Sequence, residues 1–229
     1  MIAFLPSANA FKFKNDWPHA AAFTVDVGGV DVPVGNAQRG LCGGMVFAAR
    51  DYFETGRPLP GDTSAPGSGP LYEYIGQRLK ESFGLPLGPA KYLELMATSD
   101  ADRGPWLLRV LLGMRWRGIA WRTIRGELGA ITDDLDHNHL VCLGLVCVHS
   151  TNPLDLGHNH QVLAYGYSRA GDVVTIRVYD PNRPLRDDVS LQFSTADPAK
   201  ATPIDFVNGS EDVRGFFRVP YTVKPPPQL

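Results

Sequence analysis

Cysteine is scarce in this chain: the 229 residues contain three, Cys42, Cys142 and Cys147. An odd and sparse set does not build the disulfide framework of small secreted domains, and it favours a reducing compartment. A long basic run is also missing, and the net charge is -2. Neither nucleic acid nor an anionic membrane surface is therefore an expected partner.

Long apolar runs are missing as well. No window approaches the roughly 18 apolar residues that a membrane-spanning helix needs, so no membrane span is expected. The apolar run at the start of the chain stops at Pro6, and no basic segment precedes it, which is unlike a cleaved signal peptide. These absences predict a cytoplasmic protein, with export by another route left open.

The chain has enough apolar residues for a substantial core, with 44% hydrophobic and 20% charged residues. Such a composition is ordinary for a globular protein, and the length suits one large domain or two small lobes. Helical periodicity dominates from about residue 36 to 137, whereas short β-branched and aromatic runs follow from about 138 to 223. The sequence therefore predicts one α+β domain over residues 1–229, with an N-terminal helical lobe and a C-terminal antiparallel β lobe.

Local signals place several elements within these lobes. A helix is expected from about Cys42 to Thr55, because Gly56 and Pro58 follow it. A second helical region, PWLLRVLLGMRWRGIAWRTIRGELGAITDDL, is expected to break near Gly113 or Gly118. Strands are expected in AAFTVDVGGVDVPVG, HLVCLGLVCVHS, HQVLAYGYS and DVVTIRVYD, and the RAGD segment between the last two is typical of a hairpin turn.

Cys42 lies in QRGLCGGM, where a glycine-rich loop leads into the first of these helices. A helix N-terminus carries unpaired N–H groups and a partial positive charge, and both stabilise a thiolate. The N–H of Cys42 could also point at a developing oxyanion, and Gly43 and Gly44 could let a substrate backbone come close. The alternative is a buried structural cysteine beside a tight turn.

A thiolate nucleophile needs a base, and the base needs a group that orients it. His160 begins one predicted strand, and Asp180 ends the next one. If the RAGD turn joins these strands as a hairpin, the start of one lies beside the end of the other. Hairpin geometry therefore predicts that His160 and Asp180 are neighbours. His158 and Asn182 are the alternatives for these two positions.

The segments QRGLCGGM, NHQVLAYGY and VYDPN, in this order, resemble the Cys, His and Asp segments of papain-like cysteine hydrolases, closest to the bacterial peptidase-like branch. The resemblance implies Cys42 as nucleophile, His160 as base and acid, and Asp180 as the orienting group. It also implies a peptide or amide substrate in a cleft between the lobes, and no cofactor. The family places an oxyanion glutamine six residues before the Cys; here that position is Asn36, and Gln38 lies four before.

The histidines offer a rival interpretation, because five of the six lie between residues 137 and 160. A His-x-His pair on a strand can bind one ion. However, neither CxxC nor HExxH occurs, and Cys142 and Cys147 are five apart in an apolar run, as core residues would be. No metal site is therefore predicted.

Two other functions use the same residues. Acyl transfer, as in transglutaminases or arylamine acetyltransferases, relies on the same order of Cys, His and Asp. A papain-like binding or scaffold domain could keep these residues without turnover. Thiolate chemistry distinguishes the enzymes from a scaffold, and the acceptor, water or amine, distinguishes hydrolysis from transfer.

Overall fold

The structure, a computed structural model, describes residues 2–17, 23–27, 30–34, 41–84, 87–103 and 116–228. The helices of these segments are α1 (Pro6–Asn9), α2 (Cys42–Glu54), α3 (Pro70–Ser82), α4 (Leu87–Ala97), α6 (Ile119–Trp121) and α7 (Leu128–Asp136). A π-helical stretch, Arg122–Glu127, joins α6 to α7, so that residues 119–136 form one continuous helix. A short 3-10 helix spans Pro153–His158.

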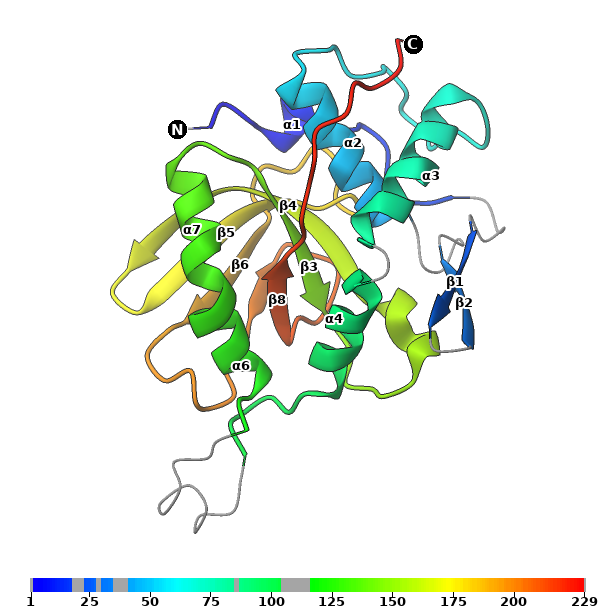
Figure 1. Cartoon of the computed structure of the whole chain (residues 1–229). Helices are drawn as coiled ribbons and strands as arrows, with labels where there is room; N and C mark the ends of the chain where they lie inside the picture. Colours follow the sequence, from blue (N-terminus) through cyan, green and yellow to red (C-terminus); the bar gives the residue numbers. More distant parts are fainter. Residues whose placement is uncertain are drawn as a thin grey trace.

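Eight strands of the described segments form two sheets. They are β1 (Phe23–Val27), β2 (Val30–Val34), β3 (Val141–Val146), β4 (His160–Ala170), β5 (Val173–Tyr179), β6 (Ser190–Ser194), β7 (Asp205–Val207) and β8 (Gly215–Arg218). The first two make a small antiparallel hairpin, and the other six form a curled antiparallel sheet in the order β7-β6-β5-β4-β3-β8 (Figure 1). The predicted α+β class is thereby confirmed.

Helices cover both faces of the larger sheet, and each face has its own apolar core. On one face, Met45 and Val46 of α2 belong to the same cluster as Leu163 of β4. On the other face, Ile131 of α7 belongs to a cluster with Val162, the preceding residue of β4. Because both faces are covered, the inner strands are apolar throughout, as in the fully buried VCLGLV run of β3.

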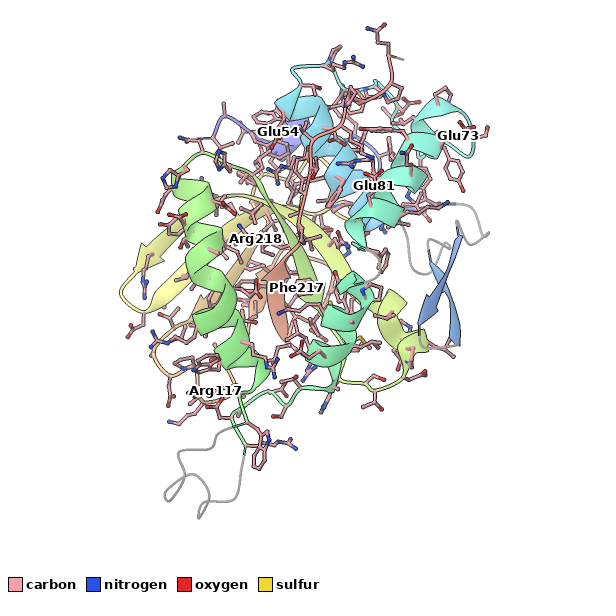
Figure 2. All side chains as sticks on the ribbon, in the orientation of Figure 1. Glu54, Glu73, Glu81, Arg117, Phe217 and Arg218 are labelled. Carbon is pink, nitrogen blue, oxygen red and sulfur yellow. The ribbon has the colours of Figure 1, made fainter. Side chains whose placement is uncertain are left out.

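The helix over residues 119–136 belongs, in sequence, to the predicted helical lobe, yet it packs on the face of the sheet opposite to α2. The sheet therefore lies between the two helical layers. Arg218 of β8 links it to this helix through an ion pair with Asp134, and Phe217 of the same strand points the other way, to the Tyr92 ring of α4, with centroids 4.8 Å apart (Figure 2).

Most of the predicted elements lie where their signals placed them. Helix α2 ends at Glu54, and Gly56 follows with a φ of 66°, as expected for a glycine that stops a helix. The turn between β4 and β5 has Gly171 at a φ of 59°, which confirms the RAGD hairpin. Helix α6 begins directly after Gly118, one of the two predicted break positions, while Gly113 and the predicted helical residues around it lie outside the described residues.

Strand β7 is an element that the sequence patterns did not indicate. It is only three residues long, and none of them is fully buried, so it carries no alternation of apolar and polar residues. Among the described residues, the structure contains no helix that is long and apolar enough to cross a membrane.

The C-terminal segment, residues 219–228, has no regular secondary structure and runs over α2 (Figure 1). A buried carboxylate, Asp51 of α2, accepts hydrogen bonds from the Tyr221 hydroxyl (2.7 Å) and the Lys224 backbone N–H (2.9 Å). Arg78 of α3 donates to the same carboxylate and to the Thr222 carbonyl. The end of the chain thus holds the first two long helices together.

Candidate active site

Cys42 is the first residue of α2 and is 8% exposed. The two glycines after it serve helix packing. A Cβ on Gly43 would lie 2.2 Å from the Ser82 hydroxyl oxygen, and one on Gly44 would lie 2.1 Å from the Ile75 carbonyl oxygen. The expectation that these glycines admit a substrate backbone is therefore wrong: both face α3 or its end, and they let α2 approach it closely.

His160 and Asp180 are neighbours, as the hairpin argument predicted. Leu163 of β4 pairs with Tyr179 of β5. The first residue of β4 and the residue after β5 therefore lie side by side, where β4 begins and β5 ends. The His160 Nε2 atom lies 2.7 Å from the Asp180 Oδ1 atom. The two side chains are 5% and 0% exposed, so the pair is shielded from water.

The imidazole of His160 lies between two acidic groups. Its Nε2 atom is hydrogen-bonded to Asp180, which leaves Nδ1 for the neighbouring Cys42 thiol. Burial lowers the pKa of His160, but the charges of Asp180 and Cys42, with their hydrogen bonds, raise it to well above its usual value. The ring is thus held in position to exchange a proton with the sulfur.

Asp180 is buried, yet donors keep it ionised. Burial raises the pKa of this carboxyl group, whereas His160, the Asn182 backbone N–H (2.8 Å) and the Ser210 hydroxyl (3.1 Å) lower it, and the net pKa is below its usual value. A carboxylate that accepts several hydrogen bonds favours its charged form. The Pro181 that follows has a fixed φ, which restricts this turn.

The side chain of Asn182 forms its hydrogen bonds with residues other than the histidine. Its Oδ1 atom accepts a hydrogen bond from Asn15 (3.0 Å), and its Nδ2 atom donates to Ser210 (3.1 Å). Asp180 therefore holds the orienting position that Asn182 was considered for. The His158 side chain is 51% exposed and lies 3.5 Å from Asp155. The two oxyanion candidates, Asn36 and Gln38, lie outside the described residues.

A cleft of about 690 Å³ opens over these residues. The residues that line it are mostly polar, and they include Cys42 and His160. Its walls come from the N-terminal arm (14–16), the segment 147–160, the turn 182–183 and the loop 210–212. Such a cleft with converging polar groups is the usual setting of a small-molecule or peptide site.

The other two cysteines differ from each other. Cys142 is fully buried, and burial raises the pKa of its thiol to about 11 although Arg50 lowers it. Cys147 was also predicted as a core residue, but it lies beyond the end of β3, is half-buried and lines the cleft. Burial raises the pKa of Cys147 strongly, and the nearby Glu211 raises it further, so its thiolate is disfavoured.

The histidine cluster does not converge in the structure. Within the described segments, no group of three or more His, Cys, Asp or Glu side chains is arranged to hold a metal ion. His137 is exposed at the end of α7, where it lies 3.6 Å from Asp133. His158 and His160 instead line the cleft.

Two polar residues near His160 and Asp180 had no sequence signal. Ser210, from the loop before β8, donates to Asp180, and Asn15, from the N-terminal arm, contacts Asn182. Both come from irregular segments far from positions 160 and 180, so neither periodicity nor a motif pointed to them.

Comparisons with protein-family models, with curated proteins and with solved structures find no match for this chain. The candidate site therefore rests on its own features: a thiol at a helix start, an imidazole whose pKa this thiol raises, and a buried carboxylate hydrogen-bonded to the imidazole.

Proposed function

We propose that this chain is a papain-like cysteine hydrolase that cleaves a peptide or amide bond through an acyl-enzyme. Cys42 is the nucleophile, His160 is the base and the acid, and Asp180 orients the imidazole. The observation that supports this most strongly is the position of the His160 ring, hydrogen-bonded to the buried Asp180 carboxylate and near enough to Cys42 for that group to raise the pKa of the ring. The cleft over these residues would hold the substrate.

In the first half of the reaction, His160 takes the thiol proton and the Cys42 sulfur attacks the carbonyl carbon. A C–S bond forms, and the electron pair of the C=O bond moves onto oxygen. In this proposal, backbone N–H groups at the start of α2 stabilise that charge. The imidazolium then donates its proton to the amine nitrogen as the C–N bond breaks, which leaves a thioester on Cys42.

In the second half, water enters the cleft and attacks the thioester carbon. His160 takes the water's proton, the C–S bond breaks, and the sulfur recovers a proton as the acid leaves. Asp180 keeps the ring in the tautomer with Nδ1 toward the sulfur, and its negative charge stabilises the imidazolium of both halves.

A purely structural role explains these residues less well. A buried charged pair contributes little net stability, because desolvation costs offset the attraction between the charges. A thiol placed against such a pair, at the floor of an open cleft, has no packing purpose that an alanine would not serve. Perturbed pKa values of this kind cluster at functional sites, which supports the enzymatic interpretation.

Alkylation kinetics test this proposal, with Cys147 as an internal control that lines the same cleft. Iodoacetamide at pH 7 is expected to modify Cys42 at least about tenfold faster than Cys147, because burial raises the pKa of Cys147. His160→Gln keeps a donor for Asp180 but removes the base, and it should slow Cys42 alkylation at least about tenfold. Mass mapping of the modified peptides gives both rates.

Turnover is tested on a mixed peptide library, with cleavage products read by mass spectrometry and Cys42→Ala as the matched inactive variant. Cleavage that Cys42→Ala abolishes supports hydrolysis. Products joined to an added amine would instead indicate acyl transfer. Alkylation of Cys42 that is no faster than that of Cys147, or that does not change in His160→Gln, would exclude Cys42 as the nucleophile.

A further inference from the structure

Asn15 connects two parts of the site that the sequence places far apart. Its backbone N–H donates to the Pro181 carbonyl (2.9 Å), directly after Asp180. Its side-chain Oδ1 atom accepts from the backbone N–H of Leu41 (2.8 Å), directly before Cys42, and from the indole N–H of Trp17 (3.0 Å). One side chain in the N-terminal arm thus contacts both the start of the nucleophile helix and the turn that carries the orienting carboxylate.

These contacts fix the orientation of the Asn15 amide. A backbone N–H and an indole N–H can only donate, so the atom that they share has to be the oxygen. The NH2 group of Asn15 therefore points the other way, toward the Asn182 Oδ1 atom at 3.0 Å. The oxygen and nitrogen of an asparagine amide are similar in size, and here the two obligate donors identify which of them is the oxygen.

The same reasoning assigns the donors and acceptors of the next hydrogen bonds, from Asn182 through Ser210 to the Asp180 carboxylate. Because the Asn182 oxygen accepts from Asn15, its NH2 group is the one that donates to the Ser210 hydroxyl oxygen, at 3.1 Å. The single hydroxyl hydrogen of Ser210 is then left to donate to Asp180 Oδ2, also at 3.1 Å. Every bond in this hydrogen-bond chain runs toward Asp180.

We propose that Asn15 is a positioning residue that, through Asn182, fixes the Ser210 hydroxyl as a donor to Asp180 while it anchors the start of α2. The term positioning residue depends on the proposed function, whereas the direction of the hydrogen-bond chain does not. Ser210 donates to Oδ2, whereas His160 and the Asn182 backbone N–H both use Oδ1, so the hydrogen-bond chain sets which oxygen of the carboxylate is left for His160.

Asn15→Asp tests the direction of this hydrogen-bond chain. Aspartate keeps the shape and still accepts from Leu41 and Trp17, but it cannot donate to Asn182. Asn182 must then turn its NH2 group toward position 15 and its oxygen toward Ser210, whose hydrogen follows that oxygen and leaves Asp180. With one donor fewer, Asp180 attracts the His160 proton more strongly, so the pKa of His160 should rise by roughly half a unit or more.

The new charge of Asn15→Asp would also raise the pKa of His160, and Ser210→Ala separates the two effects. In the Ser210→Ala background the charge remains but the last link is gone, so Asn15→Asp should shift the pKa of His160 by clearly less than it does alone. This non-additivity is the signature of a connected network. Other charged groups around the cleft are common to all four proteins and cancel; they are Lys14, Asp16, His158, Arg183, Glu211 and Asp212.

The measurement is an NMR titration of the His160 ring in the four proteins, with the pH dependence of Cys42 alkylation beside it. An Asn15→Asp shift of equal size with and without Ser210 would overturn the proposal. Asn182→Asp breaks the same hydrogen-bond chain one link later, and it replaces Asn15→Asp if that variant does not fold. Failure of the proposed function would be recognised by a different result. The rate of Cys42 alkylation would then be the same with and without His160→Gln, whatever the NMR titration gives.

Discussion

The His160–Asp180 pair makes stability depend on pH in a defined window. Burial lowers the pKa of His160, but Asp180 and Cys42 raise it well above its unfolded value of about 6.5. A group with a raised folded pKa contributes stability that is fully present below the unfolded pKa. That contribution is lost as the pH rises through the folded pKa. The pKa of Asp180 is lowered, so its charge persists throughout this window.

Asp180→Asn should therefore cost more folding stability at pH 6 than at pH 10. At pH 6 the native imidazolium loses a carboxylate partner, whereas the charge interaction that Asp180→Asn removes becomes smaller as the pH rises through the folded pKa of His160. Urea unfolding at pH 6, 8 and 10 measures the difference in free energy of unfolding. Asp188→Asn is the control, because Asp188 pairs with Arg186 at the surface, and its effect should not change over this range.

At the scale of single residues, the sequence predicted a contact correctly where the two residues lie on consecutive elements of the chain. His160 and Asp180 flank consecutive strands, so one hairpin brings them together, and no long-range information was needed. Ser210 and Asn15 could not be found in that way, because the loop before β8 and the N-terminal arm reach the triad only through tertiary packing. The glycines after Cys42 were misinterpreted for a similar reason, since the helix that they touch begins more than twenty residues later.

Helix α2 owes its position to close contact with α3. A Cβ on Gly44 would lie 2.1 Å from the backbone carbonyl oxygen of Ile75, which cannot rotate away as a side chain could. Gly76, the next residue on α3, has open space where its Cβ would be. The two glycines therefore differ in what a methyl group would do, although both lie within helices.

Gly44→Ala should destabilise the fold by about 1–3 kcal/mol, because the two helices must move apart. Gly76→Ala should stabilise it by up to about 1 kcal/mol, because alanine lowers the entropic cost of forming a helix. Midpoints of urea unfolding at unchanged slope give both values. Equal effects of the two substitutions would contradict the close approach of α2 and α3.

Element boundaries followed from local chemistry, whereas the sheet order did not. Glycine after α2 and the RAGD turn marked their own positions, and the apolar strands were evident from β-branched runs. The placement of β8 beside β3, at the edge opposite β7, depends on pairings between distant segments. Such pairings leave no periodic signal, because the pattern of apolar residues in a strand does not depend on which strand it pairs with.

At the scale of the whole molecule, the C-terminal segment stabilises two helices from the first half of the chain, α2 and α3. The terminal segment lies against α2 and α3 and is hydrogen-bonded to Asp51 and Arg78. The ion pair between Asp51 and Arg78 is buried, with side chains 0% and 1% exposed and a separation of 2.7 Å. Contacts between residues near 51 and near 224 have no local signature, so only the folded structure identifies them.

Two carboxylates bind the same guanidinium and provide a matched comparison. Asp51 is buried, whereas Glu81, which also pairs with Arg78 and with Lys224, is 27% exposed. Asp51→Asn leaves the buried Arg78 without its charged partner and should cost about 3–5 kcal/mol. Glu81→Gln should cost no more than about 1 kcal/mol, because solvent already screens that pair.

The same pair of variants shows whether the terminal segment depends on Asp51 or merely lies beside it. The Lys224 backbone N–H donates to the Asp51 carboxylate (2.9 Å), and the Tyr221 hydroxyl donates to the same oxygen (2.7 Å). In Asp51→Asn the amide would still accept through its one oxygen, but the charge-assisted strength of both bonds would be gone. Hydrogen exchange at the Lys224 amide should therefore accelerate in Asp51→Asn relative to amides of β4, and should change little in Glu81→Gln. If exchange at Lys224 follows global unfolding in both variants, the segment opens only with the whole domain, and the terminal segment is part of one cooperative unit with α2 and α3.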